Sequence, residues 1–269
     1  MFFLTTKKYI SSFCKKFFDE ILPFYPENIR NKVKLLTLKD IDLSFETSSN
    51  WFTQQVCKIY ISNHIQSTFY VLLDVKNHFI RYVDERYFLN SKNKGFLYRE
   101  SHGDNMLYYY HNCLQYFSQE CPYKENVSRK YQTVTPFLFV TDLCKDLIKY
   151  IEMREGVSLK TFFLNKKLYT EFFFYEAYLL FSNKMNNYYE IIDRPLPFST
   201  IGNCNPELNY NNYDSKKFIL QDESIKMFAI HRFVIPQLSD EYKRNLLFFY
   251  SHFYKSDIID FINRKIFSM

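Results

Sequence analysis

The amino-acid sequence predicts an α/β domain in which a mostly parallel, twisted sheet is flanked by helices. A capped amphipathic helix, a turn and a short apolar strand follow one another between Ser49 and Leu73, and a second apolar strand ends at Ile230. Short continuous apolar runs are typical of strands that helices cover on both faces. The 269 residues are enough to bury a full core, so we expect a single domain over residues 1–269.

The first elements are set by apolar spacing and by prolines. Apolar side chains recur at helical spacing over residues 8–22, and Pro23 and Pro26 end that helix. We expect a short strand at 33–38. Ser49 or Asn50 is suited to cap a helix that ends near His64, and an apolar strand at 69–73 leads directly to Asp74.

The middle of the chain predicts three strands and two helices. A strand at 79–82 continues the sheet, and a strand at 95–100 precedes a helix at 104–119. Residues 131–140 read as an edge or irregular strand because Pro136 cannot donate to a ladder. The next helix starts at Thr141 or Asp142, and Gly156 is placed as its left-handed terminator.

Residues 158–186 predict two adjacent helices. In the second, Glu171, Tyr175 and Tyr178 share one face, whereas Glu176 is expected to point away from it. A long stretch rich in Pro, Asn and Ser at 193–215 is expected to be a lid, a binding loop or disorder. The last elements are a strand at 225–230, a helix that Ser239 caps and that ends at Phe249, and a helix at 256–266.

Composition limits the possible functions only loosely. There are 24 Tyr and 30 Phe but only 4 Gly, which indicates an AT-rich coding genome and weakens the aromatic content as evidence for stacking surfaces. The net charge of +6 is spread along the chain without a basic stripe, which argues against nucleic acid as a partner. A mild positive excess suits anionic substrates or an anionic membrane face. It equally suits a protein whose net charge serves only to keep it in solution.

Cysteine usage and the amino terminus predict a cytoplasmic protein. The six cysteines form no CxxC pair and no zinc spacing, which is typical of a reducing compartment. Lysines interrupt the first 24 residues, so they contain no signal-peptide core, and no window is long enough to span a membrane. This basic, aromatic segment is suited either to packing into the domain or to lying on the inner membrane face.

Polar side chains follow both apolar strands. Asp74, Lys76, Asn77 and His78 follow the first strand, and His231 and Arg232 follow the second. Open α/β sheets bind ligands at such strand ends, although a solvated turn would give the same pattern. A diphosphate there needs a divalent cation on carboxylates or basic side chains. Four glycines exclude a Rossmann fingerprint and a Walker loop, and there is no GxSxG, HExxH or paired-cysteine redox site.

Four stretches of the chain resemble a group of bacterial GT-A-type glycosyltransferases, most of them known only as domains of unknown function. The resemblance covers roughly residues 49–260 within an expected family region of 49–269, and it depends on the order and spacing of the stretches. They are WFTQQVCKIYISNHIQSTFYVLLDVKNHFIR, TVTPFLFVTDLCKDLIKYIE, LYTEFFFYEAYLLF and FAIHRFVIPQLS.

The resemblance implies a hexosyltransferase-type enzyme that moves a sugar from a nucleotide-sugar donor to a surface polysaccharide or lipo-oligosaccharide. Asp74 matches the first aspartate of a D-x-D-type motif, and Glu171 is the candidate general base or holds the acceptor hydroxyl. The remaining donor-side residues are Gln54, Gln55, Lys76, Asn77, His231 and Arg232.

Two departures from the family pattern shape the expectation. Mn²⁺ or Mg²⁺ would be held by Asp74 and His231, but Lys76 occupies the second acidic position and cannot ligate a cation. Lys76 is suited to neutralise the diphosphate itself. The amino-terminal part, residues 1–48, is short for this fold, so the alternative is a catalytically inactive GT-A-like interaction protein. A further rival is a membrane or nucleic-acid binder that uses the first 24 residues.

Overall fold

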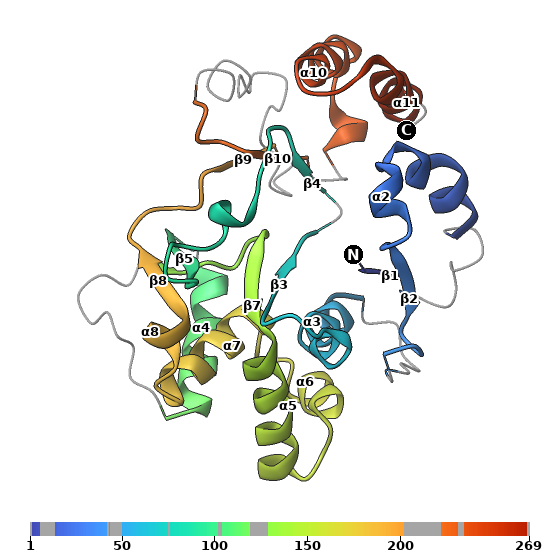
Figure 1. Ribbon diagram of the computed structural model, residues 1–269. Helices are drawn as coiled ribbons and strands as arrows, with labels where there is room; N and C mark the ends of the chain where they lie inside the picture. The colour runs from blue at the N-terminus through green and yellow to red at the C-terminus, as the bar shows by residue number, and fades with distance from the viewer. Residues whose placement is uncertain are drawn as a thin grey trace. The chain divides into compact units, whose positions relative to one another are not determined.

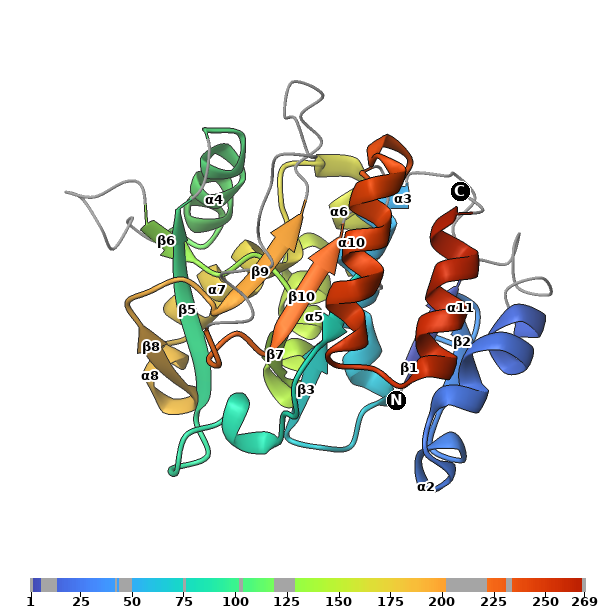
Figure 2. The ribbon, with the colours of Figure 1, turned by 90° about the horizontal axis from the view of Figure 1, so that it is seen from above.

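The computed structural model describes residues 2–5, 14–41, 43, 50–74, 76–101, 104–118, 129–201, 222–230 and 234–267 (Figures 1 and 2). The chain divides into two compact units. Unit 1 comprises residues 1–72, 100–133 and 138–189, and unit 2 comprises residues 73–99, 134–137 and 190–269. Each unit is described by itself, and the single domain expected over 1–269 stays a prediction.

The structure is a mixed α/β fold, which confirms the class predicted from the sequence. The described strands form four small sheets, with the orders β1-β2, β3-β7, β6-β5-β8 and β4-β10-β9. β1 and β2 are parallel, whereas β10 is parallel to β9 and antiparallel to β4. The strands are β1 (Phe2–Thr5), β2 (Lys34–Thr37), β3 (Phe69–Leu72), β4 (Asn77–Phe79), β5 (Gly95–Ser101), β6 (Arg129–Tyr131), β7 (Phe137–Val140), β8 (Tyr189–Ile192), β9 (Phe198–Ile201) and β10 (Met227–Ile230).

Unit 1 is built around one helix that is buried on every side. The nine residues Glu171–Leu179 of α7 (Glu171–Phe181) are all buried, and seven of them are aromatic or aliphatic, so apolar side chains occur on every side of the helix. The other helices of unit 1 are α2 (Glu27–Arg30), α3 (Asn50–Tyr60), η4 (Ile61–His64), α4 (Asp104–Tyr116), α5 (Thr141–Glu155), α6 (Leu159–Lys166) and α8 (Met185–Tyr188). The predicted helices at 50–64, 104–119 and 141–156 are therefore confirmed.

Tyrosine hydroxyls tie α7 to strand β7 inside unit 1. Tyr175 Oη accepts a hydrogen bond from the Val140 N–H at 3.1 Å and lies 3.0 Å from Tyr189 Oη. Tyr189 in turn donates to the Leu138 carbonyl at 2.7 Å. These hydrogen bonds satisfy buried polar groups, so the two hydroxyls stabilise this part of the core.

Local capping signals set several helix ends where the sequence predicts them. Gly156 follows α5 with φ +67°, the left-handed conformation that glycine adopts without strain. Ser158 accepts a hydrogen bond from the Thr161 N–H at the start of α6, and Ser239 accepts one from the Tyr242 N–H at the start of α10.

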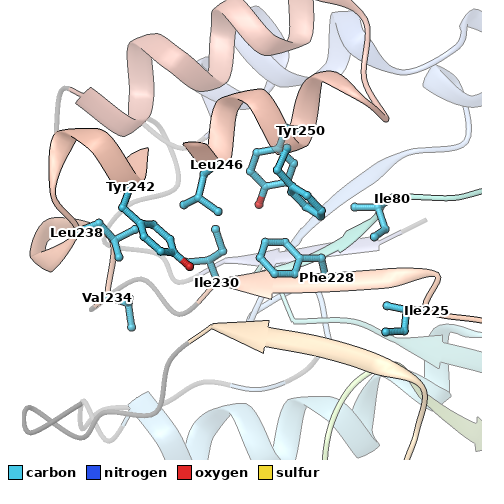
Figure 3. Close-up of a cluster of buried hydrophobic side chains, with 10 residues drawn as sticks. Ile80, Ile225, Phe228, Ile230, Val234, Leu238, Tyr242, Leu246 and Tyr250 are labelled. Atoms are coloured by element: carbon cyan, nitrogen blue, oxygen red, sulfur yellow. The ribbon is translucent and has the colours of Figure 1, made fainter. Parts of the chain in front are cut away.

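Unit 2 is organised on strand β10, whose four residues are all buried. α10 (Asp240–Ser251) directs Tyr242, Leu246 and Tyr250 onto Phe228 and Ile230 of this strand (Figure 3). The remaining elements of unit 2 are η5 (Glu85–Tyr87), η7 (Ile235–Gln237) and α11 (Ser256–Phe267), so the predicted strand at 225–230 and both carboxyl-terminal helices are confirmed.

Three predictions need correction. Strand β3 is not covered on both faces, since Val71 is 37% exposed and Leu73, just beyond it, is 43% exposed. The expected strand at 131–140 is two strands separated by a bend at Pro136. The strand expected at 79–82 begins two residues earlier, inside the polar corner. Glu176 is fully buried, and its direction away from the face of Glu171 stays a prediction.

The remaining amino-terminal and loop predictions are met in part. The first expected helix is present from Cys14 as a π-helix, η2 (Phe17–Ile21), and a 3₁₀ turn, η3 (Leu22–Phe24), whereas residues 8–13 lie outside the described residues. β9 lies within the expected loop at 193–215, of which 202–215 is not described. None of the helices in the described part of the chain is long and apolar enough to cross a membrane.

Candidate functional site

Asp74, Lys76 and Asn77 lie on one tight turn in unit 2, between β3 and β4. The Asp74 N–H donates to Asn77 Oδ1 at 2.8 Å and to Thr135 Oγ1 at 3.3 Å. Thr135 Oγ1 donates to Asn77 Oδ1 at 2.6 Å, and the Asn77 N–H donates to the Asp74 carbonyl at 2.9 Å. The side chain of Asn77 is therefore used to hold the turn, as Asn side chains often do.

The charged side chains of this turn remain at the surface. Lys76 Nζ lies 3.4 Å from Asp74 Oδ2, and the two side chains are 39% and 35% exposed. An exposed ion pair of this kind contributes only about 0–1 kcal/mol to stability. Both groups can therefore rearrange around a bound ligand at little cost to the fold.

The described part of the turn does not fit a divalent cation. A metal needs several oxygen or nitrogen ligands with negative charge close by, but the Asp74 carboxylate is already paired with an ammonium group. The described residues contain no group of three His, Cys, Asp or Glu side chains placed to hold a metal ion. His231 and Arg232, which were expected to complete this site, lie outside the described residues.

His78 belongs to the strand core and not to the polar surface that the sequence indicated. It lies in β4 opposite Phe228, and its ring contacts Tyr250 edge-on with centroids 5.9 Å apart. Burial lowers the pKa of His78, so the imidazole is neutral at physiological pH.

Glu171 lies in unit 1, at the first position of α7, and is 2% exposed. Lys58 Nζ lies 2.7 Å from Glu171 Oε1, and the same ammonium group lies 4.8 Å from the Phe172 ring centroid. Lys58 extends from α3, so this ion pair joins α3 to α7. Removal of either partner would leave the other as an unpaired buried charge, so breaking this ion pair costs stability.

Gln55 connects Glu171 to the surface of α3. We assign the NH₂ group to the end of its amide that faces Glu171, because an amide oxygen there would face two carboxylate oxygens and gain only a 3.4 Å contact with the Glu171 N–H. Gln55 Nε2 then donates to both carboxylate oxygens, at 2.9 Å for Oε1, and Gln55 Oε1 accepts from the Trp51 indole N–H at 3.1 Å. Gln55 is buried, whereas Gln54 is exposed.

Two further carboxyl groups of unit 1, Glu100 and Glu176, were not selected from the sequence. Glu176 is fully buried, and neither of its carboxyl oxygens has a hydrogen-bond partner among the described residues. Burial raises its pKa well above the usual range, and the nearby Glu100 and Glu171 raise it further. Burial also raises the pKa of Glu100 to about 7, although a hydrogen bond with the Thr133 backbone lowers it in part.

The sequence-predicted residues thus form two separate groups. The first is Asp74 with Lys76 and Asn77, all on one turn of unit 2. The second is Glu171 with Gln55, to which the structure adds Lys58 and Trp51 of α3. Lys58 follows Gln55 by three residues, one helical turn further along α3, and this spacing was the available signal that both side chains face the same neighbour.

Comparison with known protein families gives one informative result. Residues 7–230, most of the chain, match a family model that is described as a family of unknown function, DUF6492. No curated protein and no solved structure matches the chain significantly.

Proposed function

The chain belongs to DUF6492, a family of unknown function, and from that premise we propose that it is a GT-A-type glycosyltransferase. It transfers a hexose from a nucleotide-sugar donor to a cell-surface polysaccharide or lipo-oligosaccharide. The observation that carries the proposal is the exposed Asp74–Lys76 pair on a turn that other side chains hold in place.

Lys76 supplies the positive charge that the donor diphosphate requires. When the sugar is transferred, the bond between the anomeric carbon and the diphosphate oxygen breaks, and negative charge builds up on the leaving nucleoside diphosphate. An ammonium group placed at that oxygen stabilises the charge. Asp74 positions Lys76 and accepts a hydrogen bond from a ribose hydroxyl when the donor is bound. This assignment uses no metal, in keeping with the ligand set of the turn.

Glu171 is assigned to the acceptor. As general base it takes the proton from the acceptor hydroxyl while the hydroxyl oxygen bonds to the anomeric carbon. Lys58 and Gln55 fix the orientation of the carboxylate. Because Glu171 is 2% exposed, the acceptor must displace one of these contacts to reach it.

The same burial is the observation that favours the alternative function, a GT-A-like interaction protein without activity. A carboxylate that is fully satisfied by Lys58 and Gln55 serves packing as well as it serves catalysis. The two functions differ in whether the turn at Asp74 binds nucleotides, and that property can be measured directly.

Titration calorimetry with uridine, guanosine and cytidine diphosphates, each with and without Mn²⁺, tests the donor assignment. We expect one nucleotide to bind without metal and the Lys76→Ala variant to bind it at least about tenfold more weakly, a loss of about 1.4 kcal/mol. Lys92→Ala is the matched control, since Lys92 is exposed on another turn of unit 2. Absence of binding by all three nucleotides, with and without Mn²⁺, contradicts the donor site.

The cellular setting is part of the same proposal. We place the enzyme in the cytoplasm, in peripheral contact with the inner membrane where envelope glycans are assembled. The free thiols at Cys14, Cys57, Cys113 and Cys144 support a reducing compartment. Nucleic acid is not a proposed partner.

A further inference from the structure

Three aromatic side chains from two helices of unit 1 form a continuous surface. The Trp51 ring of α3 lies 5.7 Å from the Tyr109 ring of α4, and Tyr109 lies 5.7 Å from Tyr108. Trp51 is 41% exposed and Tyr108 is 55% exposed. We refer to Trp51, Tyr108 and Tyr109 as the aromatic surface. A large part of the Trp51 and Tyr108 rings stays open to solvent and is available to a ligand.

The aromatic surface is held in place by the residues around Glu171. The Trp51 indole N–H donates to Gln55 Oε1, and the amide of Gln55 donates to the Glu171 carboxylate. Trp51 is also packed edge-on against Phe52, with ring centroids 4.8 Å apart. The indole is thus oriented through two hydrogen bonds by the same carboxylate that is assigned to the acceptor.

Uncharged polar side chains border these rings. Gln54 lies three residues after Trp51 on α3, and His111 lies three residues after Tyr108 on α4, so each shares a helix face with its aromatic neighbour. Both are exposed. A surface of flat rings bordered by amide and imidazole groups is suited to an uncharged polar ligand, whereas an anionic lipid or nucleic acid would require Lys or Arg there.

We propose that the aromatic surface of Trp51, Tyr108 and Tyr109 is the binding subsite for a pyranose ring of the glycan acceptor. The C–H-bearing face of the sugar packs on the indole and phenol rings, and its hydroxyl groups bond to Gln54 and His111. A sugar bound there is next to the residues that orient Glu171. This inference rests on the proposed function, since it names where that acceptor binds.

Trp51 is the single tryptophan of the chain, so tryptophan fluorescence reports on this surface alone. We expect a saturable change in intensity or wavelength when the full chain is titrated with maltotetraose, chitotetraose or mannotetraose. Tyr108→Ala should weaken the binding of the responding sugar by at least about fivefold. Tyr82→Ala, which removes a tyrosine that is 83% exposed in unit 2, should leave it unchanged.

Three results would overturn the subsite. They are no response to any of the three sugars, a response equal in the Tyr108→Ala variant, and a response to uridine monophosphate but to no sugar. If nucleoside diphosphates bind and no sugar does, the subsite is wrong and the transferase proposal stands. If sugars bind and no nucleotide does, the subsite is supported and the transferase proposal is wrong.

Discussion

Glu176 is a carboxyl group that the fold can hold only in its protonated form. It has no hydrogen-bond partner among the described residues and is fully buried. The titratable groups that interact with it include Glu100, Glu171, Tyr189 and Cys113, and burial raises the pKa of the Cys113 thiol well above its usual range. Ionisation of Glu176 would place an uncompensated charge in the interior.

The pH dependence of stability follows from the raised pKa values of Glu100 and Glu176. A carboxyl group whose pKa is higher in the folded state contributes stability that is complete below its unfolded pKa and is lost as the pH rises. For Glu100 this loss runs from about 4.5 to about 7, and for Glu176 it continues above that range.

Glu176→Gln should therefore flatten the decline in stability at alkaline pH. We expect the variant to be more stable than the parent at pH 8.5 by about 1–3 kcal/mol, because it removes a buried ionisable group and keeps its shape. Thermal unfolding followed by circular dichroism between pH 5 and 8.5 measures the effect. Glu223→Gln, at an exposed position of unit 2, serves as the control. An unchanged pH profile in Glu176→Gln would contradict this role.

At the scale of elements, α3 and α7 are joined by a buried charge pair. The Lys58 side chain is 16% exposed and Glu171 is 2% exposed, so water screens the pair only weakly. The energetic consequence of such a pair lies less in its net contribution than in the cost of removing one partner.

Lys58→Met should destabilise the protein by about 3–5 kcal/mol, because it leaves the Glu171 carboxylate buried beside an amide alone. The double variant Lys58→Met with Glu171→Leu should recover most of that loss, since it removes both charges. Denaturant unfolding of the parent, both single variants and the double variant gives the coupling energy. If the losses of the two single variants simply add in the double variant, the pair does not join the helices as described.

The elements that sequence reasoning predicts well are those whose ends are decided locally. Ser158, Ser239 and Gly156 act on backbone groups within a few residues, so their roles follow from the sequence. The exposure of β3 could not be predicted in this way. An apolar run shows that a segment tends to be a strand, but its partners on each face are set by distant parts of the chain.

The candidate site was predicted in part for the same reason. Asp74 and Lys76 were found because a change from apolar to polar residues marks a strand end. The role of Lys58 depends on a contact with Glu171, 113 positions further along the chain. The burial of Glu176 could not be predicted, because face arguments assume that a helix has a solvent side, and α7 has none over these residues.

At the scale of the whole molecule, neither unit is a continuous piece of chain. The boundaries at 72/73, 99/100, 133/134, 137/138 and 189/190 mean that the chain passes between the units five times. Each internal segment of one unit is covalently continuous at both ends with segments of the other, and each terminal segment at one end. This connectivity favours cooperative unfolding over the independent behaviour of domains joined by one linker.

We therefore expect both units to unfold in one transition. Trp51 reports on unit 1, and a variant with Trp51→Phe and Phe248→Trp reports on unit 2 from an exposed position of α10. The urea midpoints of the two probes should coincide after correction for the change in stability that the substitutions cause. Circular dichroism of the parent and the variant measures that change. Two separated transitions would show that the units fold independently despite their connectivity.

The turn at Asp74 has a consequence for how this corner can change over evolutionary time. Its geometry depends on backbone groups and on the side chains of Asn77 and Thr135, whereas Lys76 contributes only charge at the surface. A lysine, a neutral residue or a second acid can therefore occupy position 76 without any need to refold the turn. The backbone of the turn stays constant when the charge at position 76 changes. Related chains can therefore differ in whether this turn prefers a diphosphate or a metal ion.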